Sequence, residues 1–327
     1  MTALICGNTV LFKPSSDTPL CATRLVEILD KAGLPNGVIN MVTGSGDDVG
    51  MAIVKHEKVG AVSFTGHKDT GASILRKAGL KRVGLEMGGK NGIIVMDDAD
   101  LNLALEGVIW GGYGTTGQRC TAASRVIVHE KIKSRFERML VSRIRKLKLG
   151  GGLKPETDVG PLINKTAQEK SAKYAEIRKN EGAKLLVGGK TPKIEGFFFE
   201  PTLFTDCAVG MKVAQEEIFG PVVSLISVKD FDEAIDAMNS VEYGLNSAIY
   251  TRDIGRACEA ITKIKAGLTY INSSTVGSEV HLPFGGVKHT GIGTKEGGIE
   301  GINEFSEIKT VYVDYSGQLQ RAQIDIE

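Results

Sequence analysis

Residues 59–85 read VGAVSFTGHKDTGASILRKAGLKRVGL, and the fold is most easily predicted from them. The pattern predicts a strand over Val59–Phe64, followed by a turn at Gly66. A helix over Thr70–Ala78 and a second strand over Arg82–Leu85 come next. Strand, helix and strand at this spacing are typical of a β/α unit, in which consecutive strands run parallel.

The same alternation precedes this stretch. We expect strands at Thr9–Phe12 and Val38–Val42, and helices at Thr18–Ala32 and Val49–Lys55. The first ninety residues therefore predict an α/β fold with a doubly wound parallel sheet. Such a sheet begins with a β/α unit at the nucleotide crevice. Because this chain starts almost inside a strand, we expect the sheet to be incomplete.

A second α/β region is predicted to begin at Gly92. Its expected helices are Leu101–Trp110, Lys131–Lys148, Thr166–Glu181 and Phe231–Asn239, and its expected extended segments are Ala122–Val128, Leu185–Gly189, Gly196–Pro201, Val222–Val228 and Ser247–Tyr250. Near the end, Thr310–Asp314 is a β-type run that needs a partner in its own domain or in another subunit.

Three domains are expected. They are a partial dinucleotide-binding domain at 1–91, a catalytic domain at 92–288 and a return segment with an oligomerisation strand at 289–327.

Composition sets limits on the class of protein. A net charge of +1 gives no electrostatic argument for binding nucleic acid or an anionic membrane. The five cysteines form no CxxC pair, which argues against a zinc site or a disulfide framework and favours a reducing compartment. No apolar run reaches the roughly 18–20 residues of a membrane helix. We expect a soluble cytoplasmic protein without a metal.

Cys120 lies in segment 117–121, Gly-Gln-Arg-Cys-Thr, between a glycine-rich stretch and a β-type run. A lone cysteine is more often a small buried hydrophobe than a nucleophile. Here the neighbours are small and polar, so a backbone N–H and a substrate can approach the sulfur closely. A thiolate at this position could attack a carbonyl carbon, and its own amide could stabilise the resulting oxyanion.

Glu86 follows a predicted strand in segment 85–91, Leu-Glu-Met-Gly-Gly-Lys-Asn. Parallel sheets bind their ligands at the carboxyl ends of their strands. A carboxylate in a partly apolar site there would have a raised pKa and could act as a base near neutral pH. An ordinary solvated glutamate in a turn explains this segment alone equally well.

Two further segments have weaker signals. Lys13 closes the first predicted strand, where a cation could bind a ribose hydroxyl or phosphate, or simply end the strand. Segment 64–71, Phe-Thr-Gly-His-Lys-Asp-Thr-Gly, has the glycine spacing of a phosphate-binding turn before a helix, although such turns are common. His67 fits a solvent-facing turn residue better than a catalyst.

Taken together, these segments resemble the aldehyde dehydrogenase superfamily in order and spacing, over essentially the whole chain. The matching motifs are Gly7-Asn8-Thr9 with Lys13-Pro14, Phe64-Thr65-Gly66, Glu86-Met87-Gly88-Gly89-Lys90, Gly117-Gln118-Arg119-Cys120, Glu216-Glu217-Ile218-Phe219-Gly220-Pro221 and Pro283-Phe284-Gly285-Gly286-Val287-Lys288.

The resemblance implies a role for each matching position. Cys120 matches the nucleophile, and Glu86 matches the general base that activates the deacylating water. The positions that match cofactor-binding residues are Lys13 at the adenosine ribose, Gly66 and Gly71 under the pyrophosphate, and Glu217 and Phe219 at the nicotinamide ribose and ring. Asn272 falls where the family places an asparagine near the substrate. The implied reaction is the oxidation of an aldehyde to a carboxylate with NAD or NADP.

The sequence departs from the family in two ways. Ser16 stands where many NAD-preferring members carry a glutamate that binds the ribose 2′-hydroxyl, so we expect NADP to be tolerated or preferred. The chain also begins where the family is already well advanced. The resemblance implies that the first cofactor strand, the oxyanion asparagine and an oligomerisation hairpin lie outside it. We therefore expect weak or absent dehydrogenase activity in this chain, and a homo-oligomer with altered assembly.

Three functions remain open on these grounds: a working aldehyde dehydrogenase, a relative with a binding or structural role, and a thiol esterase that uses Cys120 and Glu86 without cofactor. The sequence does not identify the aldehyde.

Overall fold

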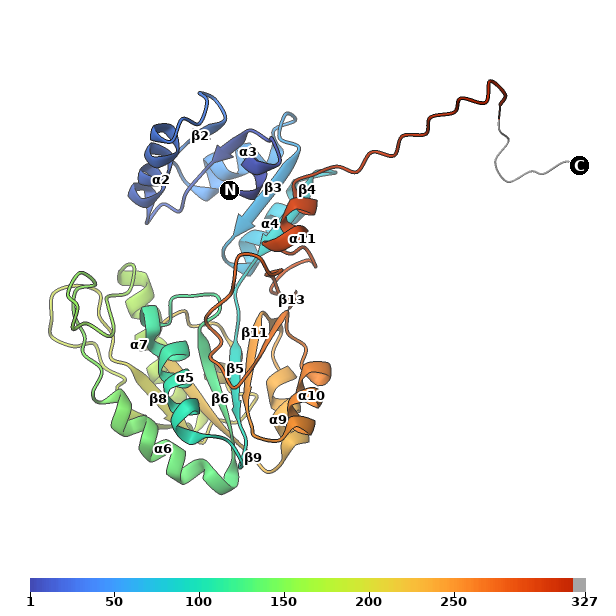
Figure 1. Cartoon of the computed structure of the whole chain (residues 1–327). Helices are drawn as coiled ribbons and strands as arrows, with labels where there is room; N and C mark the ends of the chain where they lie inside the picture. Colours follow the sequence, from blue (N-terminus) through green and yellow to red (C-terminus); the bar gives the residue numbers. More distant parts are fainter. Residues whose placement is uncertain (320–327) are drawn as a thin grey trace, which may run out of the picture.

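The computed structural model describes residues 1–319, with side chains throughout that range except those of 178–180. Two α/β bodies are stacked one above the other, and segments from both ends of the chain contribute to the upper one (Figure 1). The α/β fold class expected from the sequence is confirmed.

The upper body is built from two pairs of parallel strands. β1 (Val10–Phe12) pairs with β2 (Ile39–Met41), and β3 (Ala61–Thr65) pairs with β4 (Arg82–Glu86). The helices of this body are α1 (Thr2–Ile5), α2 (Pro19–Lys31), the π-helical turn η1 (Gly46–Gly50), α3 (Met51–Lys55), α4 (Lys68–Lys77) and α11 (Gly298–Glu304). The parallel direction is as expected, but within residues 1–319 the four strands form two separate pairs and not one sheet.

The lower body contains a seven-stranded sheet in the order β12-β11-β5-β6-β9-β8-β7. Its strands are β5 (Asn91–Val95), β6 (Ala123–His129), β7 (Lys184–Val187), β8 (Thr202–Thr205), β9 (Val222–Val228), β11 (Asn246–Tyr250) and β12 (Leu268–Ile271). All neighbours run parallel except β7, which is antiparallel to β8. A short antiparallel pair joins β10 (Tyr243–Gly244) to β13 (Val287–Lys288).

Helices cover both faces of this sheet (Figure 1). They are α5 (Leu101–Tyr113), the 3-10 turn η2 (Gly114–Gly117), α6 (Glu130–Ile144), α7 (Lys165–Glu181), α8 (Lys212–Gln215), α9 (Phe231–Asn239) and α10 (Ile254–Lys263). On β5, Ile93 and Val95 pack with α5 and α6, whereas Ile94 faces the core that contains α9 and α10. The strand is therefore buried on both sides, as expected for a parallel sheet between helical layers.

Side-chain caps fix where several of these helices begin. Asp100 accepts the N–H groups of Asn102 and Leu103 at the start of α5. Asp253 does the same for the first turn of α10. Each cap pairs backbone donors that have no partner within the helix.

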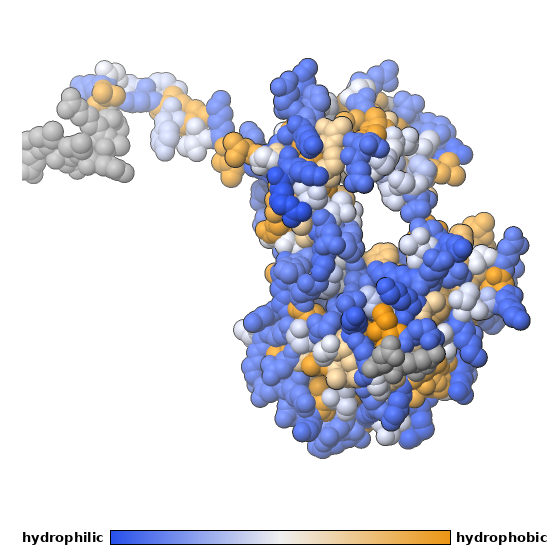
Figure 2. Space-filling model, turned by 180° about the vertical axis from the view of Figure 1, so that it is seen from behind, coloured by the Kyte–Doolittle hydropathy of each residue, from blue (hydrophilic) through white to orange (hydrophobic). Residues whose placement is uncertain are grey.

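Some predicted elements need correction. Thr310–Asp314 was expected to be a strand, but it pairs with no strand of the described chain and extends away from the body (Figure 1). Figure 2 shows hydrophobic residues along this projecting segment. Val311 and Val313, which belong to it, are 66% and 64% exposed. Gly196–Pro201 is irregular, and the strand of that region begins at Thr202. The expected boundary between 91 and 92 falls inside β5, and the three-domain division stays a prediction.

Candidate active site

Cys120 lies in a tight turn at the amino end of β6. The N–H of Ala122 donates to the carbonyl of Arg119 at 3.0 Å, which closes the turn just before the strand. Thr115 and Thr116 precede it with φ of 52° and 61°, an uncommon conformation for side chains of this type. A Cβ at Gly117 would lie 2.3 Å from the carbonyl oxygen of Gly220, so only glycine fits. The cysteine is thus presented by a strained, closely packed loop.

Asn91, the first residue of β5, fixes the backbone around the sulfur. Its Nδ2 donates to the carbonyls of Cys120 at 2.7 Å and Ala122 at 2.9 Å, while its Oδ1 accepts the N–H of Asn246 at 2.9 Å. A Cβ at Gly89 would lie 2.7 Å from the Cys120 carbonyl oxygen, so segment 86–91 passes directly beside the loop. No role for Asn91 is predicted from the sequence.

Glu86 is the last residue of β4. Its backbone carbonyl accepts a hydrogen bond, whereas its side chain forms none. Its carbonyl accepts the N–H of Gly66 at 3.0 Å. The side chain is 5% exposed, and neither carboxyl oxygen has a hydrogen-bond partner. A Cβ at Gly285 would lie 2.5 Å from Glu86 Oε1, so the carboxyl group points at the backbone of this glycine.

This environment changes the proton affinity of Glu86. Burial raises its pKa to about 8, the negative charge of Glu296 adds to the effect, and the ammonium of Lys295 opposes it. Burial is the dominant cause because a carboxylate without solvent or donors loses its hydration energy. A carboxyl group that titrates near neutral pH can both accept and release a proton during a reaction.

Burial also raises the pKa of the Cys120 thiol, and the charge of Glu86 raises it further. The backbone N–H of Thr121 faces the sulfur and acts in the opposite direction. Glu86 and Cys120 are therefore close enough to be electrostatically coupled. The arrangement favours a protonated thiol when Glu86 is ionised, so a base must take the thiol proton before the sulfur can attack.

Glu217 belongs to the same neighbourhood. Its Oε1 accepts the N–H of Gly89 at 2.9 Å, and a Cβ at Gly88 would lie 2.3 Å from its Oε2. Phe219 has a φ of 59° and is 42% exposed. The structure thus brings the EEIFGP motif (216–221) against the EMGGK motif (86–90), which adjoins Cys120.

The other expected cofactor residues follow the carboxyl ends of β1 and β3. Lys13 Nζ donates to the carbonyls of Pro14 at 2.8 Å and Gly44 at 3.3 Å, and Ser16 is exposed nearby in sequence. Gly66 begins the turn into α4, where His67 caps the helix by accepting the N–H of Asp69. His67 therefore has the local role expected of a turn residue.

These residues fit a dinucleotide. The helix α4 begins directly after a strand end, which is the arrangement that favours a pyrophosphate. A Cβ at Gly71 would lie 2.4 Å from Met87 Sδ, so glycine is required for α4 to pack this closely. The Lys13 ammonium adds a positive charge at the end of β1.

Asn272 and Cys120 lie at opposite edges of the sheet. Asn272 follows β12 at the carboxyl edge, whereas Cys120 precedes β6 at the amino edge. Strand pairing places Asn272 level with Val95, four residues beyond Asn91 on β5, or roughly 13 Å along the strand. The structure does not bring Asn272 beside Cys120, and its contact with the substrate stays a prediction.

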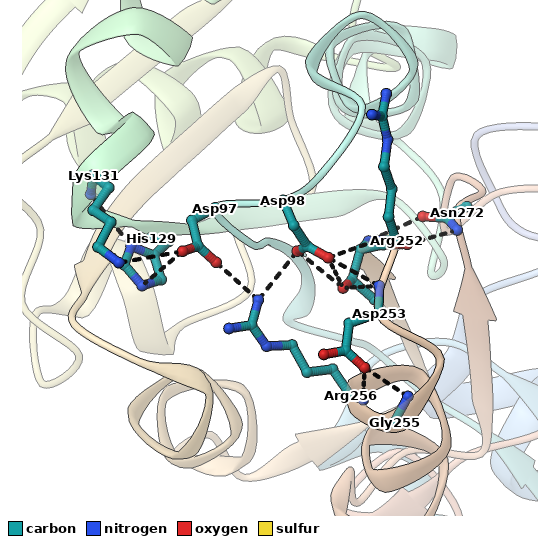
Figure 3. Close-up of polar contacts among 10 residues, drawn as sticks. Asp97, Asp98, His129, Lys131, Arg252, Asp253, Gly255, Arg256 and Asn272 are labelled. Atoms are coloured by element: carbon teal, nitrogen blue, oxygen red, sulfur yellow. Dashed lines mark hydrogen bonds and ion pairs between the residues drawn. The ribbon is translucent and has the colours of Figure 1, made fainter.

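The side-chain amide of Asn272 forms hydrogen bonds with the backbone of Thr251. Oδ1 accepts the N–H of Thr251 and Nδ2 donates to the carbonyl of Thr251, both at 3.0 Å. Figure 3 shows Asn272 beside a network that joins the ends of three strands. In that network Arg256 bonds Asp97 at 2.8 Å and Asp98 at 3.2 Å, so the charges are paired and the cluster is structural.

Within residues 1–319, no group of three or more His, Cys, Asp or Glu side chains is arranged to hold a metal ion. No helix in the same part of the chain is both long and apolar enough to cross a membrane.

Comparisons with known proteins agree with this geometry. The model of the aldehyde dehydrogenase family matches residues 1–311. A betaine aldehyde dehydrogenase of Brucella anthropi is 46% identical over 318 residues, which are 95% of this chain and 65% of that protein. A 2,5-dioxopentanoate dehydrogenase of Saccharolobus solfataricus is 43% identical over 315 residues, 95% of this chain and 66% of that protein.

Among solved structures, a point mutant of betaine aldehyde dehydrogenase from Staphylococcus aureus in complex with NAD+ superposes with a TM-score of 0.91 at 39% identity. The match covers 95% of this chain and 64% of that one. The chain thus spans about 65% of the length of the curated relatives that it matches.

Proposed function

We propose, because the chain belongs to the aldehyde dehydrogenase family, that it takes part in the oxidation of an aldehyde to a carboxylate with NAD or NADP. One observation carries the proposal. Glu86 is a buried carboxyl without a hydrogen-bond partner, it titrates near neutral pH, and it is coupled to a cysteine whose loop is fixed by Asn91.

Cys120 is the proposed nucleophile. Its sulfur adds to the aldehyde carbon while the thiol proton passes through solvent to the carbonyl oxygen, which gives a thiohemiacetal. The backbone N–H groups of Cys120 and Thr121 are the available donors for the charge on sulfur or oxygen. When bound, the cofactor supplies a hydride acceptor. Glu86 accepts the proton of the water that hydrolyses the thioester of Cys120, and its pKa of about 8 suits this role.

The residues proposed to hold the cofactor are those that follow the strand ends. Lys13 binds the adenosine ribose, Gly66 and Gly71 allow the pyrophosphate to approach the start of α4, and Glu217 with Phe219 holds the nicotinamide ribose and ring. Ser16 supports tolerance of a 2′-phosphate because its side chain is not acidic. The substrate and the choice between NAD and NADP stay proposals, as does the cytoplasmic location.

The reaction is tested by the absorbance of the reduced nicotinamide with a panel of aldehydes, betaine aldehyde and 2,5-dioxopentanoate among them. Cys120→Ala should abolish turnover, whereas Cys258→Ala, at an exposed cysteine, should leave it unchanged. Glu86→Gln should lower steady turnover about 10²–10⁴-fold while preserving an initial burst, because the thioester forms but is not hydrolysed. Full steady turnover in Glu86→Gln would exclude Glu86 as the base.

The esterase alternative uses the same two groups, because the charge of Glu86 acts on the thiol of Cys120. Hydrolysis of an activated ester in the absence of nucleotide, lost in Cys120→Ala, would favour it if no aldehyde is oxidised by the same preparation.

We also propose that the chain forms a homo-oligomer. The exposed apolar residues of 311–313 support this, because an unpaired β-type segment presents both backbone groups and hydrophobic side chains. Light scattering after size-exclusion chromatography tests it, and a monomer at micromolar concentration would contradict it.

A further inference from the structure

One face of β4 connects the C-terminal helix α11 to the proposed base. Side chains on a strand alternate, so Arg82, Gly84 and Glu86 share a face. At one end of this face, Arg82 Nη1 donates to the carbonyls of Asn303 at 3.0 Å and Glu304 at 2.8 Å, and also to that of Ser306. A guanidinium at the last carbonyls of a helix is a favourable arrangement. Arg82 therefore fixes where α11 ends.

The middle of the face has no side chain of its own. A Cβ at Gly84 would lie 1.6 Å from Glu304 Oε1, so the carboxyl group of Glu304 occupies the space that a side chain at position 84 would fill. Glu304 Oε2 is buried and has no hydrogen-bond partner. Positions two apart on a strand are about 6.6 Å apart. A second carboxyl group, with one buried oxygen that has no hydrogen-bond partner, thus lies on the same face as Glu86, about one side-chain spacing away.

We propose that Glu304 is a positioning residue for the reaction, and that its carboxyl group, seated over Gly84 by the Arg82–α11 contact, raises the pH at which Glu86 becomes a base. The two nearby cations oppose this effect, because Lys295 acts on Glu86 and Arg82 acts on Glu304. Arg82 is committed to backbone carbonyls, and Lys295 Nζ donates to the carbonyls of Gly285 at 2.5 Å and Gly286 at 2.9 Å.

The charged groups around the pair determine the sign of the effect. Glu86 faces Glu296 and Lys295 from the return segment, Cys120 from its loop and Glu304 from α11. Glu304 itself faces Arg82 and Glu296, and the amino terminus acts on Glu296. Burial and the charge of Glu296 raise the pKa of Glu304, so the pKa values of both carboxyl groups lie above the ordinary value of a glutamate. Removing the charge of Glu304 should make Glu86 easier to ionise.

The inference rests on the proposed role of Glu86, but its test does not require catalysis. Protein labelled with ¹³C at the glutamate carboxyl carbons is titrated by NMR, and the Glu86 signal is assigned by its loss in Glu86→Gln. In Glu304→Gln, which preserves volume and leaves the Arg82 contacts to backbone carbonyls in place, the Glu86 midpoint should fall by about half a pH unit or more. Glu300→Gln, an equal charge change at an exposed position of the same helix, should leave the midpoint unchanged.

Gly84→Ala supplies an independent variant, because its methyl group would displace the Glu304 carboxyl from this face of β4. Like Glu304→Gln, it should lower the midpoint of the Glu86 titration. An unchanged midpoint in Glu304→Gln, or an equal shift in Glu300→Gln, would overturn the proposal. Where aldehydes are oxidised, the rising limb of rate against pH should move with the midpoint. If the midpoint moves in protein that oxidises no aldehyde, the proposed function fails while this inference stands.

Discussion

Replacing Asn91 with alanine should loosen the Cys120 loop and destabilise the protein. The side chain makes three hydrogen bonds to backbone groups, with Cys120, Ala122 and Asn246, and the residue is 3% exposed. Each such bond contributes about 0.5–1.5 kcal/mol net, and a buried group left unpaired costs about 1–3 kcal/mol. The loss should therefore be about 3 kcal/mol in the free energy of unfolding.

Urea unfolding measures this loss, and the rate of Cys120 alkylation in native protein reports on the loop. Alkylation should change by at least about tenfold, because the carbonyls on either side of the sulfur lose the group that fixes them. Asn40→Ala is the control, because Asn40 Nδ2 makes one exposed bond to the Gly37 carbonyl and should cost less than about 1 kcal/mol. If Asn91→Ala costs no more than Asn40→Ala and leaves alkylation unchanged, Asn91 does not hold the loop.

Four further outcomes are expected. The pKa of Glu86 in the folded protein is raised to about 8, so its contribution to stability is present below the pKa of the unfolded chain and is lost as the pH rises through 8. Glu86→Gln should therefore stabilise the protein at pH 9 relative to wild type by on the order of a few kcal/mol and have little effect at pH 4. Equal effects at both pH values would contradict this. Ser16→Glu should raise KM for NADP at least about tenfold over KM for NAD, and an unchanged ratio would remove Ser16 from the ribose site. Asn272→Ala should cost about 1–3 kcal/mol by urea unfolding through its two bonds to Thr251. Val311→Lys should reduce the oligomer fraction in light scattering, and unchanged assembly would show that this residue is not in the interface.

The local elements of the first ninety residues could be predicted because their hydrophobic periodicity is strong. The helix expected at Thr18–Ala32 is α2 at Pro19–Lys31, and proline at its first position marks its start. β5 was missed because it is buried on both faces and follows directly on the EMGGK segment (86–90), so its apolar run shows no alternation. The division of the upper strands into two pairs depends on long-range pairing, which local patterns do not encode.

For the site, too, local features could be predicted from the sequence and long-range contacts could not. Cys120 and Glu86 could be proposed from the sequence because their residue types and glycine neighbours have chemical meaning by themselves. Asn91 was missed because its partners are backbone atoms of segments up to 155 positions away. The position of Asn272 relative to Cys120 could not be predicted, because a motif gives a position along the chain and does not state at which edge of the sheet a strand ends.

Segment 86–91 holds Glu86 of the upper body beside the Cys120 loop of the lower body. It is the direct link from the end of β4 in the upper body to the start of β5 in the lower body. Glu86 begins it, Gly89 bonds Glu217 in the middle, and Asn91 bonds the Cys120 loop at its end. Since each contact uses the backbone or a buried side chain of so short a link, Glu86 cannot shift far from Cys120 without breaking one of them. The glycines at 88 and 89 are required for the same reason, because a side chain at either position would meet Glu217 or the Cys120 carbonyl. The EMGGK motif is thus a geometric requirement for holding the proposed base, Glu217 and the proposed nucleophile together.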